Sequence, residues 1–201
     1  MELNLKGKKV LVTGGSRGIG KAIAKAFLGE GAVVGIVARS TDELLQTKEE
    51  LGVQQIYQKD LLKQEDREQL VREFVNDFNT IDVLVNSAGA NHGNAVLNTP
   101  AGKFNEAMEL NFIAAVQLSQ LASQHMIDNG DGVIINIASI YGKEAGGSPS
   151  YNASKAALIS FTKSFSSEVI KNTSVSLELL PGRFIIPIKN GNGGWNATLI
   201  I

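Results

Sequence analysis

The chain has 201 residues, of which 43% are hydrophobic and 19% charged, which is enough apolar material for one domain with a sizeable core. Its 19 basic and 20 acidic side chains leave a net charge of −1 without a long basic run, so no nucleic-acid partner is expected. It has two histidines, no cysteine and no carboxylates clustered at ligand spacing, which excludes disulfides and thiolate zinc sites and predicts no metal site.

Short β-branched runs alternate along the chain with longer amphipathic stretches, a pattern typical of strand, helix, strand repetition. The near-continuous apolar character of the runs suits strands buried on both faces of a parallel sheet. We therefore predict a doubly wound α/β fold with three layers, α/β/α, and six strands. The expected strands are residues 9–12, 33–37, 55–57, 83–85, 133–137 and 174–179, and the expected helices are residues 18–29, 41–51, 64–78, 100–128 and 150–171.

A glycine-rich turn, TGGSRGIG at residues 13–20, joins the first strand to the first helix. Gly14 permits the tight turn, Gly18 lets the backbone approach a pyrophosphate, and Gly20 allows the helix to pack closely on the strand. The helix N-terminus adds amide donors and the positive end of a dipole. This context favours dinucleotide binding over a purely structural glycine loop. The candidate cofactor contacts in the turn are Gly14, Ser16, Arg17, Gly18, Ile19 and Gly20.

The second strand ends in Val37-Ala38-Arg39-Ser40, where no carboxylate stands to bind a ribose 2′-hydroxyl. Arg39, beside Ser40, and Arg17 can both offer forked guanidinium donors to a 2′-phosphate. The sequence thus favours NADP(H) over NAD(H), the alternative being that both arginines are solvated surface residues. Asp60, just after the third strand, either accepts a hydrogen bond from the adenine amino group or caps the helix that begins near Gln64.

Three residues near the fifth strand carry the candidate chemistry. Tyr151 and Lys155 are four residues apart and share one face of a helix. An ammonium group beside a tyrosine hydroxyl favours the phenolate, so the hydroxyl can exchange a proton nearer neutral pH. Ser139 follows the fifth strand, at the sheet edge where open α/β sheets bind ligands. The three side chains suit carbonyl chemistry, although Tyr-x-x-x-Lys also occurs in helices by chance.

Across residues 6–182, these motifs resemble in order those of the classical short-chain dehydrogenase/reductase family, which has a Rossmann-like fold. The resemblance rests on the glycine turn, on NSAG at residues 86–89, on Asn111 in the long central helix, on Ser139 with the segment 151–155, and on Pro181-Gly182. Residues 132–139 and 156–163 are most similar to the 3-oxoacyl-[acyl-carrier-protein] reductase branch. The resemblance to the family implies an NAD(P)-binding domain over residues 1–182 and an atypical tail over residues 183–201.

The resemblance also implies a mechanism, in which NADPH delivers hydride to a carbonyl carbon while Tyr151 protonates the oxygen. Ser139 would stabilise that oxygen, and Lys155 would act on Tyr151 and hold the nicotinamide ribose. Asn111 would anchor a water that joins Lys155 to solvent, or else be a polar residue satisfied inside the core. The other predicted cofactor contacts are Ser40, Asn86, Ala88, Gly89, Tyr151, Lys155, Pro181 and Gly182, although residues 86–89 can also be just a turn.

The chain departs from the family after Pro181-Gly182. The family commonly carries a threonine a few residues later, whereas residues 183–188 read RFIIPI. We expect the chain to lack the family's substrate-covering helices and seventh strand. We expect an irregular tail, whose last apolar residues add a strand to a sheet edge, pack on the core or stay disordered. Two functions stay open: an NADP(H)-dependent oxidoreductase acting on a small-molecule carbonyl or alcohol, and a truncated NADP-binding protein with little or no turnover.

Two further expectations concern assembly and location. The two long predicted helices carry Ala, Ser and Phe on more than one face, which suits a helix-to-helix contact, so we expect a homo-oligomer and favour a dimer. The N-terminus lacks the apolar stretch of a secretion signal, and no apolar run approaches the ~20 residues of a membrane helix. We therefore expect a cytoplasmic protein with no membrane partner.

Overall fold

The computed structural model describes residues 4–169, 174–179, 185–189 and 195–200. Six parallel strands form one sheet in the order β3-β2-β1-β4-β5-β6, which confirms the predicted architecture. The strand order reverses between β1 and β4, and ligands bind at the carboxyl ends of the strands beside such a point. The strands are β1 (Lys9–Thr13), β2 (Val33–Ala38), β3 (Gln55–Gln58), β4 (Val83–Asn86), β5 (Gly132–Ile137) and β6 (Ser174–Leu179).

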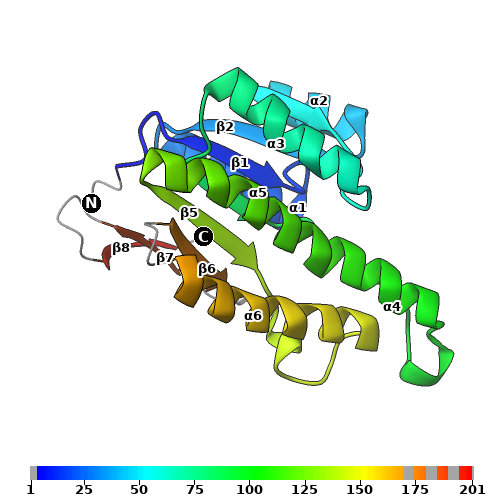
Figure 1. Ribbon diagram of the computed structural model, residues 1–201. Coiled ribbons are helices and arrows are strands. Elements are labelled where there is room, and N and C mark those ends of the chain that lie inside the picture. The colour runs from blue at the N-terminus through cyan, green and yellow to red at the C-terminus, as the bar shows by residue number, and fades with distance from the viewer. Residues whose placement is uncertain (1–3, 170–173, 180–184, 190–194, 201) are drawn as a thin grey trace.

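Helices cover both faces of this sheet. Helices α1 (Gly18–Gly29) and α2 (Thr41–Leu51) pack on one face. Figure 1 shows α3 (Gln64–Phe78), α5 (Ala114–Asn129) and α6 (Pro149–Val169) in front of the sheet, with α1 behind it. The three layers are those that the sequence predicted.

Strand β1 shows why the buried strands lack an alternating polar face. Val10 and Val12 belong to the core cluster that contains Phe27 of α1, whereas Leu11 belongs to the cluster that contains Phe74 of α3. All five side chains are at most 1% exposed. Since both faces of the strand are covered, every position in it gains from an apolar side chain.

The long central helix differs from the continuous helix predicted over residues 100–128. Helix α4 (Ala101–Met108) passes into a π-helical turn, η2 (Glu109–Ile113), before α5 begins. A π-helical turn holds more residues than an α-helical one, and such turns are frequent at functional sites. Asn111 lies in this turn and is only 1% exposed.

The tail differs from the irregular segment that the sequence predicted. Strands β7 (Ile185–Lys189) and β8 (Trp195–Ile200) pair antiparallel in a second, two-stranded sheet. Figure 1 draws this pair beside β6, and β8 does not extend the six-stranded sheet. The two apolar, β-branched runs flank a segment rich in Gly and Asn, which is the sequence signal of a hairpin.

Candidate active site

The loops that follow β1, β2, β4 and β5 surround one cleft of about 810 Å³. The predicted cofactor-binding residues and the predicted catalytic residues meet in this cleft, because the parallel strands all end at the same edge of the sheet. The predicted site residues that line the cleft are Gly14, Ser16, Arg17, Gly18, Ile19, Gly20, Arg39, Ser40, Ala88, Gly89, Ser139, Tyr151 and Lys155.

The glycine turn is shaped by close backbone contacts. A Cβ on Gly20 would lie 2.2 Å from the carbonyl oxygen of Gly14, and a Cβ on Gly14, whose φ is +64°, would lie 3.0 Å from the Cα of Ala88. Arg17 is the N-cap of α1, and no side chain among the described residues caps that helix start. The first amides of α1 are therefore arranged for an anion such as a pyrophosphate.

Thr13, the last residue of β1, fixes the loops around the turn. Its Oγ1 accepts hydrogen bonds from the N–H groups of Ser87 and Ala88, both at 2.9 Å. The N–H of Gly14 donates to the carbonyl oxygen of Val37 at the end of β2, also at 2.9 Å. The loops after β1 and β4 and the end of β2 are thereby held together around the crevice.

Ser139 stands just beyond β5 and is 3% exposed. Its Oγ accepts a hydrogen bond from the N–H of Tyr141 at 3.2 Å, so it caps the short turn η3 (Ile140–Gly142). Because that bond uses the oxygen as an acceptor, the hydroxyl hydrogen can be donated to another group.

Lys155 lies one helical turn after Tyr151 and is 4% exposed. Its Nζ donates to the carbonyl oxygen of Ile137 at 2.7 Å and lies 5.7 Å from the centroid of the Tyr151 ring. Burial lowers the pKa of Lys155 to about 8. A Cβ on Gly89 would lie 3.6 Å from the same Nζ, which places the loop after β4 against the lysine.

Asn111 does not line the cleft, and protein atoms occupy its side chain. Its Oδ1 accepts from the N–H of Ala90 at 2.8 Å, while its Nδ2 donates to the carbonyl oxygen of Ala90 and to the Oγ of Ser154, both at 3.0 Å. The amide therefore ties the loop after β4 to α6, as expected of a polar residue that is satisfied inside the core. The water relay through Asn111 stays a prediction.

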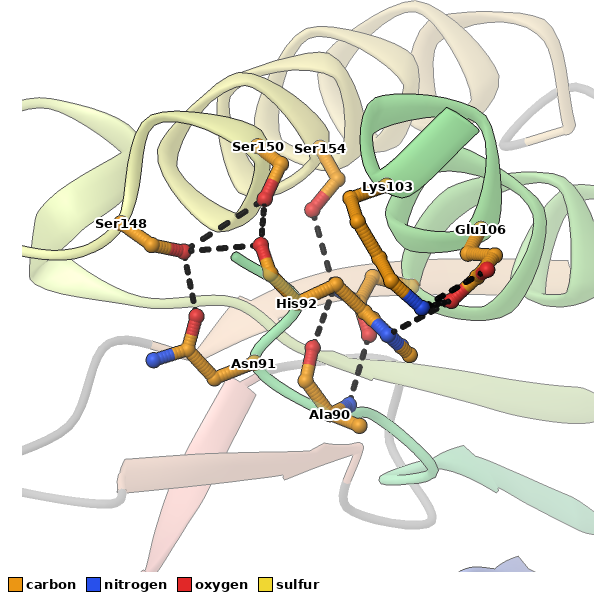
Figure 2. A network of polar contacts seen from close by, with 9 residues as sticks. Ala90, Asn91, His92, Lys103, Glu106, Ser148, Ser150 and Ser154 are labelled. Carbon is orange, nitrogen blue, oxygen red and sulfur yellow. Dashed lines mark hydrogen bonds and ion pairs between the residues drawn. The ribbon is translucent and has the colours of Figure 1, made fainter. Parts of the chain in front are cut away.

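The same loop is fastened to the start of α6 by a second set of contacts (Figure 2). The carbonyl oxygen of His92 accepts from the hydroxyls of Ser148, at 3.3 Å, and Ser150, and Ser148 also donates to Asn91. The His92 imidazole points the other way, with its Nδ1 3.3 Å from a carboxylate oxygen of Glu106. These contacts fix the helical turn that carries Tyr151.

Two predicted cofactor contacts lie elsewhere. The Nδ2 of Asn86 donates to Asn136 at 2.8 Å and to Ser119 at 3.1 Å, so this side chain turns into the core and away from the cleft. Asp60 accepts from the N–H of Leu62 at 3.2 Å in a turn before α3, whose N-cap is Lys63. Neither Asn86 nor Asp60 is among the described residues that line the cleft.

The remaining predicted contacts, Pro181 and Gly182, lie outside the described residues. Sequence reasoning also missed several lining residues, of which Glu43, Lys59, Asn91, Tyr141 and Gly147 are polar, aromatic or small. The sequence does single out Glu43, because Ser40-x-x-Glu43 is a capping-box pattern. That pattern predicts a helix start and does not predict that the Glu43 side chain lines the cleft.

In the part of the chain that the structure describes, no three or more His, Cys, Asp or Glu side chains form a group that could hold a metal ion. The described helices include none with the length and apolar character needed to cross a membrane.

Comparisons with known proteins agree with the observed fold. The sequence profile described as "short chain dehydrogenase" matches residues 8–182. The 3-oxoacyl-[acyl-carrier-protein] reductase of Chlamydia pneumoniae is 35% identical over 188 residues, which span 90% of this chain and 75% of that protein.

Two solved structures share the fold. L-sorbose reductase from Gluconobacter frateurii, complexed with NADPH and L-sorbose, superposes with a TM-score of 0.86 and 34% identity over 90% of this chain and 72% of that one. An NAD⁺-bound xylitol dehydrogenase superposes with a TM-score of 0.85 and 27% identity over 92% of this chain and 73% of that one. The two neighbours carry different nicotinamide cofactors.

Proposed function

The chain belongs to the short-chain dehydrogenase family, and we propose that it is an NADP(H)-dependent oxidoreductase that transfers hydride between nicotinamide and a carbonyl or secondary alcohol. The observation that carries this proposal is that Ser139, Tyr151 and Lys155 line the same cleft as the glycine turn. The similarity to 3-oxoacyl-[acyl-carrier-protein] reductase supports a substrate of that kind.

The lining residues suit a dinucleotide along the cleft. The N-terminus of α1 and the glycine turn would hold the pyrophosphate, because the side chain of the N-cap residue Arg17 makes no capping hydrogen bond to the first amides of α1. Arg17 and Arg39, both exposed on the cleft wall, would bind a 2′-phosphate. Lys155, beside Gly89, would hold the nicotinamide ribose. When bound, the cofactor supplies or accepts the hydride.

Side chains of the protein would supply the proton that the substrate oxygen needs when the carbonyl is reduced. During reduction, the Tyr151 hydroxyl gives its proton to the carbonyl oxygen as that oxygen gains negative charge. The ammonium group of Lys155 favours the phenolate that remains. The Ser139 hydroxyl, whose oxygen already accepts from the Tyr141 N–H, donates its hydrogen to the same substrate oxygen. In the oxidation direction, each step is reversed.

We place this enzyme in the cytoplasm as a homodimer. The absence of cysteine fits a reducing compartment. Phe112, Phe161 and Phe165 form a row of packed rings on η2 and α6 that is only half-buried within the chain, and a second copy would cover this apolar surface. Light scattering after size exclusion would give twice the chain mass, and a monomer would contradict the dimer.

The second candidate is an NADP-binding protein with little turnover. It is favoured by the lack of a hydroxyl side chain at residues 183–188, where relatives of this kind place a threonine. A protein of this kind would still bind the cofactor but would not transfer hydride to a substrate at a useful rate.

The test begins with a fluorescence titration of the purified chain with NADPH and with NADH, followed by a ketone screen that measures NADPH oxidation. Micromolar NADPH binding, much weaker NADH binding and a turnover that Tyr151→Phe abolishes are the expected results. Binding without turnover would support the second candidate, and binding of neither cofactor would overturn both.

A further inference from the structure

Glu43 places a carboxylate on the cleft wall next to the group proposed to bind the 2′-phosphate. The hydroxyl of Ser16, a residue only 6% exposed, donates to Oε2 of Glu43 at 2.9 Å. Nη1 of Arg17 lies 3.5 Å from the other carboxylate oxygen, Oε1. All three residues line the cleft.

The helix start alone does not account for this orientation. Ser40 caps α2 by accepting from the N–H of Glu43 at 3.3 Å, and a glutamate at this position commonly reaches back to the N-cap amide. Here the carboxylate instead reaches across to the glycine turn. One helical turn later, the Thr47 hydroxyl donates to the carbonyl oxygen of Ser16 at 2.9 Å, so α2 fastens the turn at two points.

The charges on this wall oppose one another. Among the described lining residues the cationic groups near this end are Arg17, Arg39 and Lys59, and Lys59 is already paired with Glu73 at 3.0 Å. Glu43 is the carboxylate in the same set. The Arg17 side chain is 78% exposed and the pair is long, so this ion pair contributes little to holding Arg17 in place. A phosphate would compete with Glu43 for Arg17 and be repelled by it.

We propose that Glu43 sets the cofactor selectivity of this chain, by opposing the 2′-phosphate that Arg17 and Arg39 attract. This inference rests on the proposed function, because it concerns the same cofactor cleft. In this proposal, the two arginines attract the 2′-phosphate of NADP(H) and the Glu43 carboxylate repels it. The preference for NADP(H) over NAD(H) is therefore smaller than the arginines alone would give.

Glu43→Gln is the direct test, since the amide oxygen can still accept from Ser16 while the charge is removed. At low ionic strength, NADPH should bind about three- to tenfold more tightly to the variant, and NADH should change less than about twofold. The gain should shrink in 1 M KCl, because salt screens charges at this exposed site. The matched control is Glu49→Gln, an exposed charge on the same helix that is not among the lining residues.

The outcomes separate the two proposals. A parallel change in NADPH and NADH affinity, weaker NADPH binding, or a gain unchanged by salt would assign Glu43 a structural role and overturn this inference while the proposed function stands. A gain of equal size in Glu49→Gln would assign it to net charge and would also overturn it. A wild-type chain that binds neither cofactor would overturn the proposed function, and this inference with it.

Discussion

The Nζ of Lys155 donates a hydrogen bond to the carbonyl oxygen of Ile137, the last residue of β5, at 2.7 Å. This bond fixes the lysine between the end of the central sheet and the helix that carries Tyr151. It also keeps a cation in a site with almost no access to water, which has a consequence for stability.

Lys155 should make the stability of the protein depend on pH. Its pKa is about 8 in the folded protein and near 10.5 in the unfolded chain, so the unfolded chain binds more protons between these values. The free energy of unfolding therefore rises with pH from about 8 to 10.5, and below pH 8 the folded protein carries the whole cost, roughly 3 kcal/mol. Urea unfolding of wild type and Lys155→Met between pH 7 and 10 measures this contribution.

The variant lacks the titrating group, so its stability relative to wild type should fall as pH rises through this window. Parallel pH profiles for the two proteins would contradict the assignment. Thermal unfolding of the same pair checks the sign, since about 1 kcal/mol moves the Tm of a chain of this size by about 2–4 °C.

Tyr151→Phe should lower kcat for ketone reduction by at least about a hundredfold, because it removes the proton donor while keeping the ring. Its Kd for NADPH, measured by fluorescence, should stay within about twofold. Tyr141→Phe is the comparison, as this ring lines the same cleft without a role in proton transfer, and it should keep most of the turnover. Equal losses in both variants would remove Tyr151 from the mechanism.

Arg39→Ala should weaken NADPH binding about tenfold or more and leave NADH binding nearly unchanged, since a charged hydrogen bond to phosphate is lost. Arg72→Ala removes another exposed cation, on α3 and outside the cleft, and provides the baseline. Isothermal titration with both cofactors measures the difference. An unchanged NADPH affinity in Arg39→Ala would count against the 2′-phosphate site.

Gly20→Ala should destabilise the protein by at least about 2 kcal/mol and weaken cofactor binding, because the new Cβ would lie 2.2 Å from a backbone oxygen that cannot easily move. Gly29→Ala, at the other end of α1, meets nothing within 4 Å and should be neutral or stabilising by up to about 1 kcal/mol. Urea unfolding compares the two. A similar small change in the free energy of unfolding for both variants would contradict this prediction, because it would mean that the glycine turn moves to accommodate the new Cβ.

Asn86 and Asn136 should be energetically coupled. Asn86 donates to Asn136, which donates to Thr162 at 2.9 Å, so this buried chain joins β4, β5 and α6. Each alanine variant leaves a buried partner unsatisfied, and the double variant should be about 1–3 kcal/mol less destabilised than the two single variants added together. Asn86 paired with exposed Asn105 should be additive, and additivity in the first cycle would argue against the chain.

Much of the fold could be predicted, because buried parallel strands and amphipathic helices differ in period and in turn residues. The bounds of α1, α2 and α3 agree with the expected ones. The π-helical turn η2 could not be predicted, since residues 109–113 carry no proline or glycine and look like ordinary helix. The turn is accompanied by tertiary contacts that the local sequence does not reveal, the bonds of Asn111 to Ala90 and Ser154.

The glycine turn, Tyr151 and Lys155 were chosen from their residue types, and the structure places all of them along one cleft, while their chemical roles stay predictions. The lining of the cleft was not predicted where side-chain orientation decides it. Asn86 ends a strand at the right edge of the sheet, yet its side chain turns into the core to meet Asn136. Glu43 lies five residues beyond the end of β2. Its carboxylate reaches the cleft because α2 packs against the glycine turn, where the Ser16 hydroxyl donates to it.

The π-helical turn at Glu109–Ile113 also bears on how this protein can change through mutation. It amounts to one residue more than an α-helix would need, and one residue rotates a helix by about 100°. Loss of a single codon here would restore a regular helix and turn Asn111 away from Ala90. A lineage could thus lose the support of its active site in one genetic step while retaining a well-formed helix.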